Sequence, residues 1–387
     1  MIRIKSDRIV LNDNLFDGYV YMENEKIVDV CLEERPAEEV YDFTGKYVSP
    51  GFIDTHTHGA VGSGFYRTTP EQIAAACNYH LAHGTTTILP TIFACPHAHT
   101  KETIDAFLQA RSAGIILANA PGVHIEGPYL NVEQCGGQPP QYITPPIQKD
   151  YVEIMETYGD AIRRWTYAPE HDRDGSFCRY VTERGVIASA GHTNAKYADM
   201  CTAIENGCNL VTHLYSCTST VTRDHGFRSL GVIESTYLRD ELYAEMIADG
   251  KHLPPDLIRM IVKIKGIDRV IATTDSCDLA GTDLTSLQSA TATSYIIEDG
   301  VAKLPDRSAF AGSIATTDRL IRVLTQECGF GVLESVKMLT QNPALLLKLK
   351  KGSIEKDYDA DIVVFDEDIH VSDIFVNGKK IAHSNTI

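Results

Sequence analysis

Two histidines near the start of the chain are spaced for metal binding. His56 and His58 lie in the stretch 50–59, Pro-Gly-Phe-Ile-Asp-Thr-His-Thr-His-Gly, where an apolar run precedes them and a glycine follows. Residues two apart in a strand point to the same face of a sheet. The two imidazoles can therefore lie side by side and bind one divalent ion. The buried-looking strand before them favours this interpretation over two polar residues at an ordinary strand end.

Further candidate ligands follow at the ends of later apolar segments. These segments end in His-Ile-Glu at 124–126, Gly-His-Thr at 191–193, Thr-His-Leu at 212–214, Asp-Gly-Lys-His at 249–252 and Thr-Asp-Ser at 274–276. A single strand-end histidine is usually structural, but the repetition predicts one shared site. Imidazoles and carboxylates together suit a hard or borderline divalent metal. Glu126, His192 and His213 can hold one ion, and His56 and His58 a second, with Glu126 between the two.

One carboxylate remains for proton transfer. A divalent metal lowers the pKa of a bound water toward neutrality and polarises a carbonyl group. A nearby carboxylate then takes the proton of the water and passes it to the leaving nitrogen. Asp275, which follows a strand-like segment at 269–273, is predicted to do this. The pattern therefore indicates metal-dependent hydrolysis of a carbon–nitrogen bond.

The segments that must position these groups alternate between strand and helix. Thr69-Pro70 is typical of a helix start, and Gly84 of the turn that ends the helix. Strands are expected at 86–89, 122–125, 165–167, 186–190, 210–212, 245–248 and 269–273, and helices near 100–113, 194–206, 254–265 and 315–327. About eight such units predict an α/β fold, a closed (β/α)8 TIM barrel whose reactive groups lie at the C-terminal strand ends.

Both ends of the chain look different from this middle part. Residues 1–49 and 346–387 contain short alternating strands, and neither end has enough apolar surface for a core of its own. We therefore expect a small β-sandwich domain built from both termini, with the barrel over 50–345. A hairpin near 294–301 is expected as an insertion late in the barrel.

Composition excludes several classes of partner. The 387 residues carry a formal net charge of −17, which argues against a general binder of nucleic acid or of anionic membranes. No apolar run is long enough to cross a bilayer, and the N-terminus lacks the apolar core of a signal peptide. The ten cysteines are scattered and include no Cys-x-x-Cys pair. Reduced cysteines and a cytoplasmic location are expected.

Taken in order, these motifs resemble one family. The stretch 50–59, Gly-x-His-x-Glu-Gly-Pro at 122–128, Ala-Pro-Glu at 168–170, Gly-His-Thr at 191–193, Thr-His-Leu-Tyr at 212–215, Ala-Asp-Gly-x-His at 248–252 and Thr-Asp at 274–275 look like the N-acetylglucosamine-6-phosphate deacetylases of the amidohydrolase superfamily. The resemblance implies a metal-dependent barrel, metal ligands at Glu126, His192 and His213, and Asp275 as acid and base. His56 and His58 match members that hold a second metal, while other members lack the pair.

Positions that match the substrate contacts of the family are altered in part. Ser216-Cys217-Thr218 stands where the family usually has Asn-Ala-Met, and Gln138, after Gly137, replaces a sugar-contacting histidine. An aspartate that usually follows the first histidine pair is absent, with Phe65 or its neighbour in its place. The substrate-binding residues implied by the resemblance are Gly137, Gln138, Ser216, Cys217, Arg223, His252, Phe310, Ala311 and Gly312. Arg223, with Arg228 as the alternative, corresponds to an arginine that reaches the phosphate bound by a partner subunit.

The resemblance and the ligand set lead to one preferred function and two alternatives. We expect hydrolysis of the N-acetyl group of an amino sugar, with N-acetylglucosamine 6-phosphate as the preferred substrate. One or two divalent metals per subunit are expected, zinc first, with iron, manganese or cobalt as alternatives. A homodimer is also expected. The altered contacts favour, as an alternative, an enzyme for another N-acyl amine, such as an unphosphorylated or different sugar or an N-acyl amino acid. A barrel without catalysis, acting as a scaffold, is a remote alternative.

Overall fold

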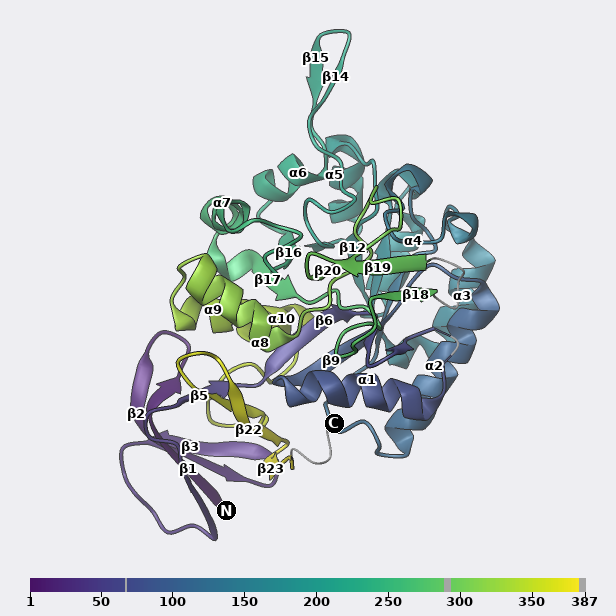
Figure 1. Cartoon of the computed structure of the whole chain (residues 1–387). Helices are drawn as coiled ribbons and strands as arrows, with labels where there is room; N and C mark the ends of the chain where they lie inside the picture. The colour runs from purple at the N-terminus through teal and green to yellow at the C-terminus, as the bar shows by residue number, and fades with distance from the viewer. Residues whose placement is uncertain (67, 289–293, 383–387) are drawn as a thin grey trace.

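Eight parallel strands form the barrel that the sequence predicts. The computed structural model describes residues 1–66, 68–288 and 294–382. The barrel strands are paired in chain order: β6 (Phe52–Thr57), β9 (Thr85–Ile92), β10 (Val123–Glu126), β11 (Ile162–Tyr167), β12 (Ile187–Ala190), β13 (Leu210–Val211), β16 (Tyr243–Ile247) and β17 (Val270–Thr273). The first and last strands meet where the amide of Asp275 donates to the carbonyl of His56 at 2.9 Å. The predicted (β/α)8 fold is therefore confirmed (Figure 1).

A buried carboxylate helps to join the first strand to the last. Asp54 of β6 accepts hydrogen bonds from the hydroxyls of Thr273 and Thr274, at 2.7 and 2.5 Å. The Asp54 side chain is fully buried, so these bonds replace the water that it loses on folding.

Helices surround the barrel and lie between its strands in the sequence (Figure 1). The first, α1, begins as predicted. Thr69 caps it, Pro70 is its first residue, and the side-chain oxygen of Gln72 accepts a hydrogen bond from the Thr69 amide. The helices are α1 (Pro70–Ala82), α2 (His97–Ser112), α3 (Gln148–Tyr158), α4 (Ser176–Thr182), α5 (Tyr197–Glu205), α6 (Val232–Leu238), α7 (Pro255–Lys265), α8 (Thr317–Arg322), α9 (Val332–Leu339) and α10 (Gln341–Leu347). None of the described helices is long and apolar enough to span a membrane.

Strands from both chain ends form one separate sheet. They are β1 (Ile2–Val10), β2 (Leu15–Glu23), β3 (Lys26–Cys31), β4 (Glu39–Asp42), β5 (Tyr47–Pro50), β21 (Ile362–Phe365), β22 (Val371–Val376) and β23 (Lys379–Lys380). They are hydrogen-bonded into a continuous sheet rather than the two sheets of a sandwich. Tyr41 of β4 packs edge-on against Phe375 of β22 at 5.3 Å, so side chains from the two chain ends also contact each other. The domain limits 1–49 and 346–387 stay a prediction, and residues 383–387 lie outside the described part.

Two insertions rise from the strand ends of the barrel. The expected late hairpin belongs to a three-stranded sheet of β18 (Ser286–Gln288), β19 (Ser294–Glu298) and β20 (Val301–Lys303). A second hairpin, β14 (Thr222–Asp224) with β15 (Phe227–Ser229), projects far from the barrel (Figure 1). Two short strands, β7 (Gly59–Ala60) and β8 (Ser63–Gly64), form the turn after the first barrel strand.

Candidate active site

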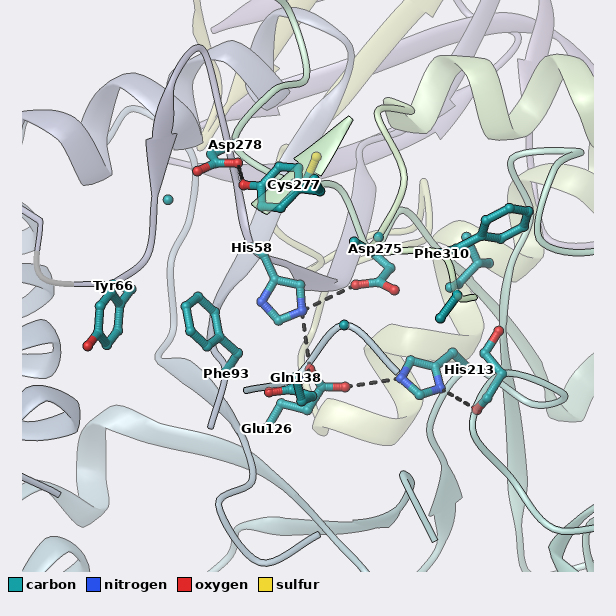
Figure 2. Close-up of a pocket in the computed structure, with 18 of the residues that line it drawn as sticks. His58, Tyr66, Phe93, Glu126, Gln138, His213, Asp275, Cys277, Asp278 and Phe310 are labelled. Carbon is teal, nitrogen blue, oxygen red and sulfur yellow. Dashed lines mark hydrogen bonds and ion pairs between the residues drawn. The ribbon is translucent and has the colours of Figure 1, made fainter. Parts of the chain in front are cut away.

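The predicted ligands and Asp275 meet at the C-terminal end of the barrel. His56 and His58 come from the end of β6 and Glu126 from the last residue of β10, while His192, His213 and Asp275 follow β12, β13 and β17. Most of these side chains line one pocket with a volume of about 500 Å³, and Figure 2 shows His58, Glu126, His213 and Asp275 pointing toward one another. Segments far apart in the sequence thus supply one site, as the barrel geometry requires.

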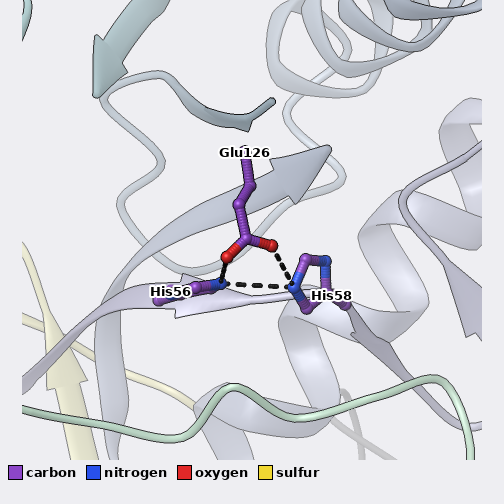
Figure 3. A group of neighbouring side chains, drawn as sticks. All are labelled: His56, His58 and Glu126. Atoms are coloured by element: carbon purple, nitrogen blue, oxygen red, sulfur yellow. Dashed lines mark hydrogen bonds and ion pairs between the residues drawn. The ribbon is translucent and has the colours of Figure 1, made fainter. Parts of the chain in front are cut away.

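Glu126 is the centre of the cluster. Its Oε1 lies 3.1 Å from the Nε2 of His213 and 3.2 Å from the Nε2 of His192. The same oxygen is 3.4 Å from the Nε2 of His56, and Oε2 is 3.2 Å from the Nε2 of His58 (Figure 3). The side chains therefore form two ligand groups that share Glu126, one with His56 and His58 and one with His192 and His213.

The far side of each imidazole faces a hydrogen-bond acceptor. The Nδ1 atoms of His192, His213 and His58 donate to the backbone carbonyls of Gln134, Ser216 and Thr91, at 2.8, 3.1 and 3.2 Å. The Nδ1 of His56 donates to the Glu245 carboxylate at 3.2 Å. These partners fix the tautomer in which Nε2 carries a free lone pair, as is common for metal-binding histidines.

The arrangement of the Nε2 atoms fits divalent metal ions. The Nε2 atoms of His56 and His58 are 3.2 Å apart, and so are those of His192 and His213. Lone pairs at this distance from one another and from a carboxylate repel each other unless a cation lies among them. Three imidazole or carboxylate donors around each position also leave room for a water or substrate.

The charges of the cluster favour a cation as well. Burial alone would lower the pKa of His56 and of His58, but the negative charges of Glu126 and Asp275 outweigh burial and raise these pKa values to about 10 and about 9. Burial would raise the pKa of Glu126, yet the surrounding histidines hold it well below its usual range. The two carboxylates therefore attract positive charge, which a proton or a metal ion can provide.

Several of these residues adopt a strained backbone. His192, His213 and Asp275 have φ values of 48°, 29° and 46°, in the left-handed region that non-glycine residues rarely occupy. Each follows directly on a barrel strand, so the turn directs the side chain back over the barrel end. Such strain is typical of functional sites, where the surrounding structure holds it.

Asp275 lies beside the ligands on the pocket side. Its Oδ1 is 3.2 Å from the Nε2 of His58 and 3.5 Å from that of His56. Its backbone carbonyl accepts the amide of Ser313 at 2.7 Å, and the Ser313 hydroxyl donates to the carbonyl of Thr274 at 2.6 Å. The segment at 310–313 thereby holds the Asp275 turn in place.

A buried ion pair beneath the cluster was not predicted from the sequence. Arg164 of β11 and Glu245 of β16 are both fully buried inside the barrel and form an ion pair with two hydrogen bonds. Glu245 also accepts from Nδ1 of His56 and, at 3.3 Å, from the backbone amide of His213. Although burial opposes its ionisation, Arg164 and His56 hold the pKa of Glu245 below its usual value. One carboxylate thus supports a ligand of each group.

Most of the predicted substrate contacts line the same pocket. Gly137, Gln138, Ser216, Cys217, His252, Phe310, Ala311 and Gly312 all do so. His252 is oriented by Asp249, whose Oδ2 accepts from its Nδ1 at 2.9 Å, and its ring packs edge-on against Phe310.

Gln138 and Arg223 differ from the other predicted substrate contacts. The Nε2 of Gln138 donates to Oε2 of Glu126 at 2.5 Å, and its Oε1 accepts the amide of Ala94 at 2.8 Å. Gln138 thus supports a metal ligand, and its contact with a substrate stays a prediction. Arg223 is exposed on the projecting hairpin of β14 and β15 and is not part of the pocket wall.

Comparison with known proteins agrees with this geometry. A model of the amidohydrolase family matches residues 47–383. The N-acetylglucosamine-6-phosphate deacetylase of Lysinibacillus sphaericus is 30% identical over 90% of this chain and 89% of its own length. The deacetylase of Rattus norvegicus is 30% identical over 90% of this chain and 87% of its own length. The crystal structure of a mutant Mycobacterium smegmatis N-acetyl-D-glucosamine-6-phosphate deacetylase, in complex with N-acetyl-D-glucosamine-6-phosphate, superposes with a TM-score of 0.90 at 26% identity, covering 98% of each chain.

Proposed function

The chain belongs to the amidohydrolase family and, within it, to the N-acetylglucosamine-6-phosphate deacetylases, and we propose that it hydrolyses N-acetylglucosamine 6-phosphate to glucosamine 6-phosphate and acetate. The observation that carries this proposal is the complete ligand set around Glu126 with Asp275 beside it. The protein is a metal-dependent amidohydrolase, so the expectation of an enzyme rather than a scaffold is met. We also propose a cytoplasmic location, which the scattered free cysteines support.

We infer that the two ligand groups hold one or two divalent metals, with zinc as the first choice. Glu126, His192 and His213 would hold one ion, and His56, His58 and Glu126 the second. A bound divalent metal would supply an activated water and polarise the amide carbonyl. Imidazole and carboxylate donors suit zinc, and they also accept iron, manganese or cobalt.

Asp275 is the proposed acid and base. Its carboxylate faces the pocket and lies within 3.5 Å of both His56 and His58. From there it takes the proton of the attacking water and donates it to the nitrogen of the departing amino sugar. The hydrogen bonds from Ser313 to Asp275 and Thr274 hold this carboxylate in position during both transfers.

The sugar is proposed to lie between His252 and the loop at 310–312. His252 keeps Nδ1 on Asp249, so its Nε2 can accept a hydrogen bond from a sugar hydroxyl or, when protonated, donate one. Phe310 offers an apolar ring, and Ser216 and Cys217 line the same pocket. The altered identities at 216 and 217 support a sugar pocket that differs in detail from that of the relatives.

Arg223 is the proposed phosphate contact, reached across a homodimer. The projecting hairpin places Arg223 away from the pocket of its own subunit (Figure 1). Arg228, its partner in the hairpin register, donates to the carbonyl of Gly226 at 2.7 Å. Within the described residues Arg223 makes no such bond, so its guanidinium is available for the phosphate of a neighbouring subunit.

The direct test is acetate release by the zinc-loaded protein. N-acetylglucosamine 6-phosphate should be turned over, and the unphosphorylated sugar much more slowly. Arg223→Ala should remove most of this preference, whereas Arg228→Ala is the matched control and should keep it. Absence of turnover on both sugars, with metal bound, would contradict the proposal.

Mixing two variants that are both impaired at low concentrations of N-acetylglucosamine 6-phosphate tests the shared site. In a mixed dimer of Asp275→Asn and Arg223→Ala subunits, one pocket has both functional groups. If the hairpin crosses the dimer, reassembled mixtures should recover about a quarter of the wild-type sites. No recovery, or an active monomer in sedimentation, would contradict the sharing.

A second candidate function is deacylation of another N-acyl amine. Gln138 in place of the usual histidine, with Ser216 and Cys217, supports it. Equal rates on phosphorylated and plain N-acetyl hexosamines, with no effect of Arg223→Ala, would favour this candidate over the first.

A further inference from the structure

One side of the pocket has no role in the proposed reaction. Its wall consists of Tyr66, Phe93, Gly64, Asp278 and Tyr295, beyond His58. Building on the proposed function, we propose that this wall forms an acyl subsite, which accepts N-acyl groups longer than acetyl that end in a hydrogen-bond donor, an ammonium or a hydroxyl group. Asp278 would receive the donor.

The position of the wall assigns it to the acyl side of the amide. Figure 2 shows Tyr66, Phe93 and Asp278 on one side of His58, and Phe310 and His213 on the other side, next to Asp275. The proposed sugar contacts, His252 and 310–312 among them, occupy the second side. The amide nitrogen of the substrate carries the sugar, so it lies toward the second side. The acyl chain on the carbonyl carbon then extends toward Tyr66 and Phe93.

This wall extends further than a methyl group needs. The ring centroid of Phe93 lies 6.1 Å from that of His58, and the ring of Tyr66 stacks on Phe93 at 5.1 Å. The Tyr66 hydroxyl is held in turn by Nδ1 of His99 at 2.8 Å, so the outer ring has a fixed position. Two successive rings beyond a metal ligand provide apolar contact for a chain of several carbons.

Asp278 supplies a negative charge at the rim of this wall. One of its carboxylate oxygens accepts the hydroxyl of Tyr295. The other lies beside Gly64, where a Cβ atom would be 3.4 Å away, and Asp278 is part of the pocket lining. Among the described residues Asp278 has no cation within ion-pair distance, and the charge of His58 only partly offsets the burial of its carboxylate.

The surroundings make this carboxylate a strong acceptor. Burial raises the pKa of Asp278, which reflects the poor solvation of its charge. A substrate ammonium or hydroxyl would restore the interaction that water cannot provide there. Asp278, from the loop after β17, brings a carboxylate next to the turn after His58, where its backbone carbonyl accepts the amide of Gly62 at 2.7 Å.

The test compares acyl chains of equal length on glucosamine 6-phosphate. N-butanoyl and N-(3-aminopropanoyl) groups differ only in a terminal methyl or ammonium group, and N-(3-hydroxypropanoyl) replaces this end by a hydroxyl. We expect kcat/KM of the zinc-loaded enzyme to be roughly tenfold or more higher for a donor-bearing chain than for the butanoyl chain. The two donor-bearing chains then distinguish an ammonium from a hydroxyl ligand.

Variants separate the charge from the apolar wall. Asp278→Asn should bring the ratio of donor-bearing to butanoyl chains close to one, whereas Asp283→Asn, an exposed aspartate outside the pocket, should keep the wild-type ratio. Phe93→Ala should reduce the rate on butanoyl relative to acetyl. Two results would overturn the subsite alone, provided that the acetyl substrate is turned over. One is a wild-type ratio of donor-bearing to butanoyl chains near one, and the other is a ratio that Asp278→Asn does not change. No turnover of any acyl chain would overturn the proposed function, and the subsite with it.

Discussion

The metal-ligand cluster and the substrate rim around it are built from different parts of the fold. The cluster stands on barrel strand ends and is almost fully buried: His56 and Glu126 are 0% and 1% exposed. The rim stands on loops and hairpins, where Phe310 is 39% exposed and Arg223 lies on a projecting hairpin. The cluster retains every ligand that the resemblance implies, while the rim departs from it at 216 and 217. The candidate catalytic groups therefore stand on the barrel strands, whereas the candidate substrate contacts stand on loops and hairpins.

The largest effect is expected from Asp275→Asn, which removes the proton carrier and retains the shape of the side chain. Turnover of N-acetylglucosamine 6-phosphate should fall by about 10²–10⁴-fold because an amide cannot accept the proton of the attacking water. Metal content, measured by elemental analysis, should stay at the wild-type value. In contrast, Arg223→Ala on the rim should mainly raise KM. Wild-type turnover by Asp275→Asn would show that the proton carrier lies elsewhere.

Glu245→Gln tests whether the barrel interior supports the cluster. This change removes the charge that holds Nδ1 of His56 and leaves Arg164 buried without its partner. Metal affinity should fall by roughly 10–100-fold, and the free energy of unfolding should drop by about 3–5 kcal/mol.

Competitive chelator titration and denaturant unfolding measure these two losses. Glu241→Gln, the same change at an exposed residue of the same segment, is the control and should alter neither quantity. Unchanged metal affinity in Glu245→Gln would mean that the ion pair serves the barrel alone.

The pH dependence of metal uptake tests the charges of the metal-ligand cluster. Without metal, the carboxylates raise the pKa of His56 to about 10 and of His58 to about 9, so both imidazoles carry protons at neutral pH. A metal ion must displace these protons, so affinity should rise with pH and level off above about 9–10. The expected slope is about tenfold per pH unit for each displaced proton. Isothermal titration of metal-free protein at several pH values measures it, and an affinity that falls as pH rises would contradict these charges.

The smallest effect is expected on the rim, from Phe310→Ala. Loss of the ring next to His252 should raise KM a few-fold and leave kcat nearly unchanged, because the proposed contact of this ring is with bound substrate rather than with the reacting atoms. Leu238→Ala, an exposed apolar residue of α6, is the control. A drop in kcat with an unchanged KM would place Phe310 with the catalytic groups.

The same division explains what the sequence could predict. The strand-end motifs revealed Glu126, His192, His213 and Asp275, because a parallel barrel brings all C-terminal strand ends together whatever the loops do. Helix α1 was predictable from Thr69 and Pro70 since capping is local. Helices α3, α4 and α6 were not predicted, because Ile147, Gly175 and Gly231 at their N-cap positions are weaker signals than Thr69.

Residues whose roles depend on three-dimensional contacts could not be predicted. Arg164 follows another arginine and looks like a surface charge, yet it points into the barrel and pairs with Glu245, 81 residues later. The resemblance assigns Gln138 to substrate binding, and no sequence signal shows that its amide also donates to Glu126. Asp278 lies three residues after Asp275, and only the folded structure shows that it lines the pocket beside Gly64.

The most direct test of the two-group metal cluster is the metal content of a double variant, His56→Gln with His58→Asn. The zinc-loaded wild type should contain two metal equivalents per subunit, and the double variant one, held by Glu126, His192 and His213. Loss of all metal from a folded double variant would contradict this assignment, because it would place the essential ion at His56 and His58 instead.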